Sequence, residues 1–156
     1  MTVTVRPCHH QRETLAEAVL RDLPDWFGIE ESTRAYIAAA GRLPMLIAES
    51  DGVAVGFLCL ERTTAAAMDI HVVGVLRAWH RRGVGHALLA AFVATARDEG
   101  ASLLTVKTLS ARHPDPFYAA TRRFYEAEGF LPVAELDLWG PENPCLLMAM
   151  PLGSPR

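Results

Sequence analysis

Residues 79–89, WHRRGVGHALL, combine protonatable or cationic side chains with two glycines directly before an apolar helical pattern. A helix N-terminus leaves backbone N–H groups unpaired and carries partial positive charge, and glycine lets the backbone approach an anion closely. Each glycine costs a helix about 1 kcal/mol and cations there oppose the helix dipole, so a merely solvated basic turn is the weaker interpretation. The stretch predicts a phosphate or pyrophosphate site. Its residues are His80, Arg81, Arg82, Gly83, Val84, Gly85 and His86.

Composition indicates one folded domain. The chain has 156 residues, 51% of them hydrophobic and 21% charged, as in ordinary globular proteins. Its net charge of −3 gives no general attraction to nucleic acid, so any cationic function is local. Three widely spaced cysteines, no apolar run of ~18 residues and no signal-peptide pattern favour a cytoplasmic protein without a membrane span. We expect a single domain over 1–156, with its core at about 2–152.

Hydrophobic periodicity and turn residues predict the order of the elements. Asp51-Gly52 marks a two-residue hairpin turn, while Asp115 before proline starts a helix that Gly129 ends. The helix after the glycine-rich stretch joins two strands, which should therefore be parallel. The expected strands are 2–7, 43–50, 53–61, 68–76, 102–109, 130–139 and 145–152, and the expected helices are 11–21, 30–40, 84–99 and 116–128. This β-α-α-β-β-β-α-β-α-β-β order indicates an α/β fold with a mixed, mostly antiparallel sheet flanked by helices.

Two motifs resemble those of the GNAT superfamily of N-acetyltransferases. HRRGVG, from His80 to Gly85, is similar to the family's acyl-CoA pyrophosphate loop, with histidine where the family prefers glutamine or arginine. FYEAEGF, residues 124–130, is similar to its closing helix motif. The dinucleotide fingerprint fails at Leu88, and no P-loop lysine follows the glycines. The resemblance spans about residues 2–152, and LWGPENPCLLM near the end resembles one bacterial branch of the superfamily.

The resemblance implies a single-domain GNAT fold with acetyl-CoA as cosubstrate and no metal. The pyrophosphate would lie on the glycine-rich loop. The pantetheine arm would pair with the backbone of Val73, Gly74 and Val75, which would also polarise the thioester carbonyl. Tyr118 stands where the family often has an asparagine, so an amide contact to the cosubstrate is not carried over, and we place Tyr118 itself beside that cosubstrate.

The reaction implied by the family is attack of an amine on the acetyl carbonyl, with a thiolate leaving. A lysine-like amine of pKa ~10.4 must first lose a proton. Asp69 holds the strand position of a glutamate found in the histone-acetyltransferase branch, and His71 lies two residues on, on the same strand face. A histidine of ordinary pKa ~6.5 is a plausible relay, although a lone strand histidine is often only structural. Asp69, His71 and water all remain open as the base.

The family's helix tyrosine falls on Tyr125. A phenol of pKa near 10 suits protonation of the departing thiolate. The alternative is a core aromatic, since Phe124 and Phe130 stand beside it in the sequence. Tyr118, about two helical turns away on a similar face, is the second choice for the acid.

In this family the first two helices and their connection wall the acceptor groove. Trp26 and Phe27 would pack on an acceptor and Glu30 would attract its cation, although such aromatics often cap a core and acidic residues suit a first helical turn. His9-His10 lacks an evident third metal ligand. Cys59 and Cys145, inside expected strands, should pack rather than react.

Two function classes follow from the sequence. The first is an acetyl-CoA-dependent N-acetyltransferase, monomeric or homodimeric, that acts on a small-molecule or peptide amine. The second is a non-catalytic acyl-CoA-binding or sensing module on the same fold. The candidate acid and bases, Tyr125, Asp69 and His71, favour the enzyme because binding alone does not need them.

Overall fold

The computed structural model describes residues 2–153. The chain forms two compact units, unit 1 with Met1–Glu61 and His71–Thr95, and unit 2 with Arg62–Ile70 and Ala96–Arg156. Strand β4 and helix α3 contribute residues to both units. The expectation of one domain over 1–156 stays a prediction, and each unit is described by itself.

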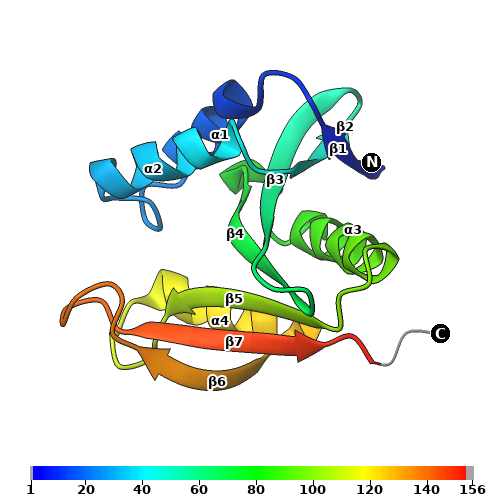
Figure 1. Ribbon diagram of the computed structural model, residues 1–156. Helices are drawn as coiled ribbons and strands as arrows, with labels where there is room; N and C mark the ends of the chain where they lie inside the picture. The colour runs from blue at the N-terminus through cyan, green and yellow to red at the C-terminus, as the bar shows by residue number, and fades with distance from the viewer. Residues whose placement is uncertain (1, 154–156) are drawn as a thin grey trace. The chain divides into compact units, whose positions relative to one another are not determined.

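The elements follow the predicted order, labelled as in Figure 1. The strands are β1 (Val3–Cys8), β2 (Met45–Ser50), β3 (Val53–Arg62), β4 (Ala67–Val75), β5 (Leu103–Leu109), β6 (Leu131–Leu136) and β7 (Cys145–Pro151). The helices are α1 (Arg12–Arg21), α2 (Glu30–Ala40), α3 (Val84–Asp98) and α4 (Pro116–Glu128), with one unpredicted 3₁₀ turn, η1 (Arg77–Trp79). The strand expected to reach residue 139 ends at Leu136, before the bend at 138–139.

The strand order is β1-β2-β3-β4-β5-β7-β6. The β1/β2, β2/β3, β5/β7 and β6/β7 pairs are antiparallel. The β4/β5 pair is parallel, with Asp69 opposite Thr105, because helix α3 forms the crossover between these strands. The α/β fold with a mixed, mostly antiparallel sheet is confirmed.

In unit 1, α1 and α2 lie side by side, and both contribute side chains to a buried cluster together with the strands of this unit (Figure 1). The β2–β3 turn has positive φ at both central residues, 51° at Asp51 and 76° at Gly52, as a tight hairpin turn requires. The largest almost fully buried side chains that this cluster contributes are Leu20 and Phe57. Burial of this apolar surface holds the helices against the strands.

Unit 2 contains helix α4 beside strands β5, β7 and β6 (Figure 1). The Asp115 side chain caps α4 by accepting hydrogen bonds from the backbone N–H of Phe117, at 2.8 Å, and of Tyr118, at 3.2 Å. Gly129 ends the helix at φ 109°, a left-handed conformation that favours glycine. Both predicted helix ends are therefore confirmed, and they fix where Tyr118 and Tyr125 lie along α4.

Candidate active site

The β4–α3 connection in unit 1 exposes backbone at the start of a helix. Arg81 and Gly83 are left-handed, with φ of 62° and 80°, so the chain turns sharply just before α3 begins at Val84. A Cβ placed on Gly83 would meet no atom within 4 Å, so that side of the backbone is open. Ala87 N–H donates to the Gly83 carbonyl at 3.0 Å, and the N–H groups of Val84 and Gly85, at the first two positions of the helix, have no carbonyl of the preceding helical turn to bind.

The side chains of this loop supply positive charge. Arg81, Arg82 and His86 are exposed, and the Arg82 guanidinium lies 5.1 Å from the centroid of the Trp79 ring. Exposed cations, an open glycine and the N-terminal end of a 15-residue helix together fit a pyrophosphate. The residues present therefore suit the phosphate portion of a CoA ester.

His80 makes structural contacts in addition to its place in the glycine-rich loop. Its Nε2 donates a hydrogen bond to the Val75 carbonyl at 2.7 Å, and its ring meets the Trp26 ring edge-on at 5.5 Å between centroids. Because the Val75 oxygen is an acceptor, the proton must reside on Nε2. His80 therefore ties the glycine-rich loop to the end of β4.

Arg77 adds a link that the sequence did not suggest. Its backbone N–H donates to the Asp22 carboxylate at 2.7 Å, and its guanidinium donates to Asp25 at 2.6 Å and lies over the Trp26 ring. The loop is thus anchored to the α1–α2 connection within unit 1. No sequence signal could reveal these contacts, because 55 and 52 positions separate the partners.

The end of β4 alternates between buried and half-buried residues. Gly74 is buried, and a Cβ there would come within 2.9 Å of Val19, so packing against α1 requires a glycine. Val73 and Val75 alternate with it and are half-buried. The resemblance assigns pantetheine to this backbone, and Gly74 has a packing reason of its own.

Asp69 lies in a buried polar group of unit 2. Its side chain is 7% exposed, and Oδ1 accepts a hydrogen bond from the Thr105 hydroxyl at 2.6 Å. Lys107 Nζ lies 3.9 Å from Oδ2. The carboxylate therefore has hydrogen-bonding and electrostatic partners from the neighbouring strand β5.

His71 lies in different surroundings, in unit 1. Its side chain is 28% exposed, and Nδ1 lies 3.6 Å from a carboxylate oxygen of Glu61 on β3. The Tyr36 ring, from α2, meets the imidazole edge-on at 5.6 Å between centroids. Glu61 was not identified from the sequence, where it stands as the last residue of an apolar strand pattern.

The two tyrosines of α4 differ in burial. Tyr125 is 4% exposed, and the centroids of the Phe124 and Phe130 rings both lie 5.5 Å from its own. Tyr118 is half-buried in the first turn of the helix. Tyr125 therefore packs like a core aromatic residue, and it also holds the position of the family's helix tyrosine, which suggested it as the acid.

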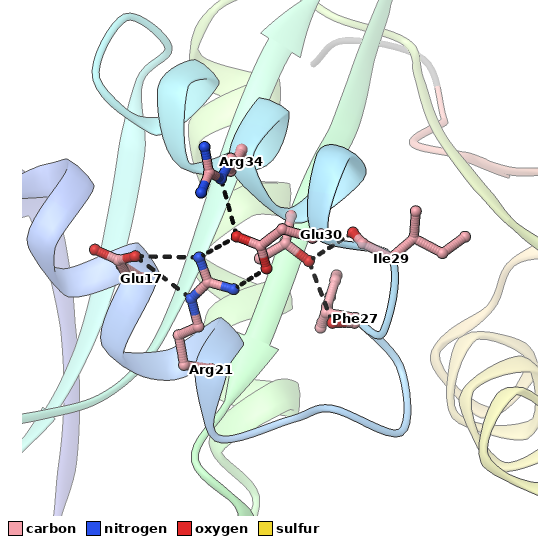
Figure 2. A network of polar contacts seen from close by, with 7 residues as sticks. Glu17, Arg21, Phe27, Ile29, Glu30 and Arg34 are labelled. Atoms are coloured by element: carbon pink, nitrogen blue, oxygen red, sulfur yellow. Dashed lines mark hydrogen bonds and ion pairs between the residues drawn. The ribbon is translucent and has the colours of Figure 1, made fainter.

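The three acceptor candidates lie on or beside the α1–α2 connection. Trp26 contacts Arg77 and His80, and the Phe27 ring meets the Tyr36 ring at 5.8 Å. Figure 2 shows that the Glu30 carboxylate already binds two guanidinium groups.

Glu30 accepts from Arg21 at 2.8 Å and from Arg34 at 2.9 Å. The hydrogen bonds from Arg21, and then those from Arg34, lower the pKa of the Glu30 carboxyl to about 2. Arg21 also contacts Glu17, so the network joins α1 to α2. Arg21 and Arg34 would thus compete with any cationic acceptor for the Glu30 carboxylate.

The three cysteines are buried and free. Burial raises the pKa of the Cys59 thiol to about 12, and it also raises the pKa of Cys145 above its usual value. Both thiols are therefore unreactive near neutral pH. Within residues 2–153 no group of three histidine, cysteine or acidic side chains is arranged to hold a metal ion.

No helix in the described part of the chain is long and apolar enough to span a membrane.

Comparison with known proteins identifies the family. The sequence profile described as "Acetyltransferase (GNAT) domain" matches residues 41–132, more than half of the chain. The protein belongs to the GNAT acetyltransferase family and is accordingly an acyltransferase of the class that transfers groups other than aminoacyl groups. A comparison with curated protein sequences gave no match.

Solved structures show the same fold. A GNAT acetyltransferase structure from Desulfovibrio desulfuricans superimposes with a TM-score of 0.84 at 23% identity, covering 97% of this chain and 100% of the other. The ribosomal-protein-S18-alanine N-acetyltransferase of Escherichia coli gives 0.78 at 16% identity, covering 97% and 95%. The yncA acetyltransferase structure from Salmonella typhimurium, which contains acetyl-CoA, gives 0.72 at 18% identity, covering 99% and 96%. The expected cosubstrate, acetyl-CoA, agrees with this family.

Proposed function

We propose that this protein transfers the acetyl group of acetyl-CoA to a primary amine of a small molecule or peptide. The observation that carries the proposal is the β4–α3 loop, in which Arg81 and Gly83 open the backbone at the start of a helix beside exposed cations. That loop lies within residues 41–132, which match the GNAT acetyltransferase domain. Acetyl-CoA, when bound, supplies a thioester carbonyl that an amine can attack.

His71 is the base in this proposal. A general base needs access to the proton that it removes, and the half-buried imidazole of His71 has it. The Asp69 carboxylate accepts a hydrogen bond from Thr105 and lies 3.9 Å from Lys107, so both of its oxygens already have partners on strand β5. The sequence left Asp69, His71 and water open as the base, and we select His71.

Tyr125 is the acid, and it protonates the thiolate as the carbon–sulfur bond breaks. Backbone groups of 73–75 hold the thioester arm, and Arg81 and Arg82 attract the pyrophosphate. The amine nitrogen forms the new amide bond directly, so no side chain carries the acetyl group. We keep a cytoplasmic location as a prediction.

The test is release of CoA from acetyl-CoA across a panel of primary amines. We expect at least one amine to give turnover above hydrolysis. If the protein binds acetyl-CoA and no amine releases CoA, the acyl-CoA-sensing module is the better description.

Gly85→Asp tests the loop separately. A side chain and a negative charge at the second residue of α3 should weaken acetyl-CoA binding at least about tenfold, or ~1.4 kcal/mol, measured by calorimetry. An unchanged affinity in a folded variant would contradict the pyrophosphate assignment.

A further inference from the structure

Glu61 and His71 form a pair in unit 1 that is too far apart for a direct hydrogen bond. His71 Nδ1 and Glu61 Oε2 are separated by 3.6 Å, whereas an N–H···O bond needs roughly 2.7–3.2 Å. The two side chains are 28% and 41% exposed, so a ligand from solvent can reach them. One nitrogen atom with several N–H groups could lie within hydrogen-bond distance of both.

The surroundings of this pair also fit an amine. Tyr36 of α2 covers the imidazole edge-on, and Phe27 packs on Tyr36 in turn, which makes an aromatic row beside the pair. Among the residues that the structure describes, the titratable side chains that contact the His71 ring are Glu61 from β3 and Tyr36 from α2. The row supplies apolar surface, and Glu61 supplies negative charge.

Glu61 differs from Glu30 in its partners. Two guanidinium groups already bind Glu30, whereas among the described residues the ion-pair partner of Glu61 is His71, which is charged only when protonated. A carboxylate that no arginine or lysine neutralises attracts an ammonium group more strongly than one held by two arginines. Glu61 should therefore bind the ammonium group of an acceptor more strongly than Glu30 does.

We propose that Glu61 binds the ammonium group of the acceptor and holds its nitrogen against Nδ1 of His71, which makes Glu61 the residue that selects charged aliphatic amines over uncharged aromatic ones. This inference rests on the proposed acetyl transfer and names a residue that determines its specificity. An aliphatic amine of pKa ~10.4 is cationic at neutral pH and needs both recognition of its charge and removal of a proton. An aromatic amine is uncharged there and needs neither.

The proton balance of the step is simple. The ammonium group gives one proton to Nδ1 of His71 and becomes a neutral amine, while Glu61 stabilises the imidazolium that forms. The amine lone pair then forms the carbon–nitrogen bond as the carbon–sulfur bond breaks. Tyr125 protonates the leaving thiolate, the second proton lost by nitrogen passes to solvent, from which Tyr125 regains a proton, and His71 returns its own proton to solvent.

Glu61→Gln tests the proposal with two isomeric probes, benzylamine, which is cationic at neutral pH, and 4-methylaniline, which is uncharged. These belong to the amine panel, and CoA release is the readout. Loss of a charge-assisted contact should lower kcat/KM for benzylamine and other aliphatic amines at least about tenfold, mainly through KM. The rate with 4-methylaniline and the affinity for acetyl-CoA should stay as in the parent.

The matched control is Glu49→Gln, which removes a carboxylate on strand β2 that pairs with Arg6 and should leave both rates unchanged. Glu61→Asp keeps the charge and should recover part of the loss, and it also serves if the glutamine variant unfolds. Equal losses with both probes, no loss with either, or a parent enzyme that prefers 4-methylaniline would each overturn the proposal. If the parent releases CoA with no amine at all, the acetyl-transfer function itself has failed.

Discussion

Asp69 and His71 stand two residues apart on β4, yet the structure gives them opposite surroundings. Asp69 belongs to unit 2, where its side chain is 7% exposed and contacts Thr105 and Lys107. His71 belongs to unit 1, where it is 28% exposed beside Glu61. On the strand face that they share, residues 67 and 69 are buried and residues 71, 73 and 75 are half-buried. Side chains on the same face of β4 are thus packed in the protein interior at the start of the strand and accessible to solvent at its end.

His71→Gln should have the largest effect. A positioned base contributes roughly 10²–10⁴-fold, so turnover with aliphatic amines at neutral pH should fall by that range, and the remaining rate should rise with pH as the amine itself loses its proton toward pKa ~10.4. The thermal midpoint should change little, because the side chain is half-buried. Steady-state kinetics across pH measures the turnover, and thermal denaturation measures the midpoint. The control is His9→Gln, because His9 is an exposed histidine. The comparison between Asp69 and His71 fails if turnover is kept in His71→Gln and lost in Asp69→Asn.

Tyr125→Phe should reduce turnover by about 10²-fold, because it removes the acid that protonates the thiolate. The ring still fills the space beside Phe124 and Phe130, so folding should be unaffected. Tyr118→Phe is the control on the same helix and should act weakly. If Tyr118→Phe stops turnover and Tyr125→Phe does not, the acid is Tyr118. This result would also show whether unit 2 contributes chemistry as well as packing.

Asp69→Asn should act on stability instead of chemistry. Loss of the charge that faces Thr105 and Lys107 should lower the free energy of unfolding by about 1–2 kcal/mol, with turnover close to that of the parent. Urea denaturation measures the first and CoA release the second. Asp137→Asn, an exposed carboxylate of the same unit, should change neither. Unchanged stability together with lost turnover would reverse the roles of the two regions.

Glu30→Gln should have the smallest effect and sharpens the contrast with Glu61. Arg21 holds the folded-state pKa of Glu30 at about 2, below its usual 4.5, so this contact stabilises the fold above pH about 4.5 and is lost as the pH falls toward 2. The thermal midpoint of the parent should fall more than that of the variant over this window, though only slightly, because exposed ion pairs contribute little. The KM for aliphatic amines should not change. A KM increase as large as that of Glu61→Gln would make Glu30 the acceptor's carboxylate.

The local features of the fold were predictable from the sequence, because each depends on neighbouring residues. Asp51-Gly52 makes its turn through two positive φ angles, and Asp115 caps α4 through N–H groups two and three residues away. The strand–helix order and the parallel β4/β5 pair also follow from periodicity and chain connection. The glycine-rich stretch likewise lies where a helix begins, as its composition indicates.

The contacts that distinguish the candidate residues were not predictable in the same way. The pairs Glu30–Arg21, Arg77–Asp25 and Glu61–His71 join residues from different elements. Their formation depends on strand register and on how α1 and α2 pack, which no local pattern specifies. The family's acceptor groove therefore suggested Glu30 as the residue that attracts a cation, although two arginines bind it, and nothing in the sequence selected Glu61.

The sequence by itself determined the order of elements, the turns and caps, and the position of the glycine-rich loop at the start of α3. It could also place Asp69 and His71 on one strand face, because side chains alternate along a strand. Only the tertiary structure decided that Asp69 is buried against β5 while His71 stays accessible beside Glu61. The physical reason is that alternation fixes the direction of a side chain, whereas burial and charge depend on which other elements cover that direction.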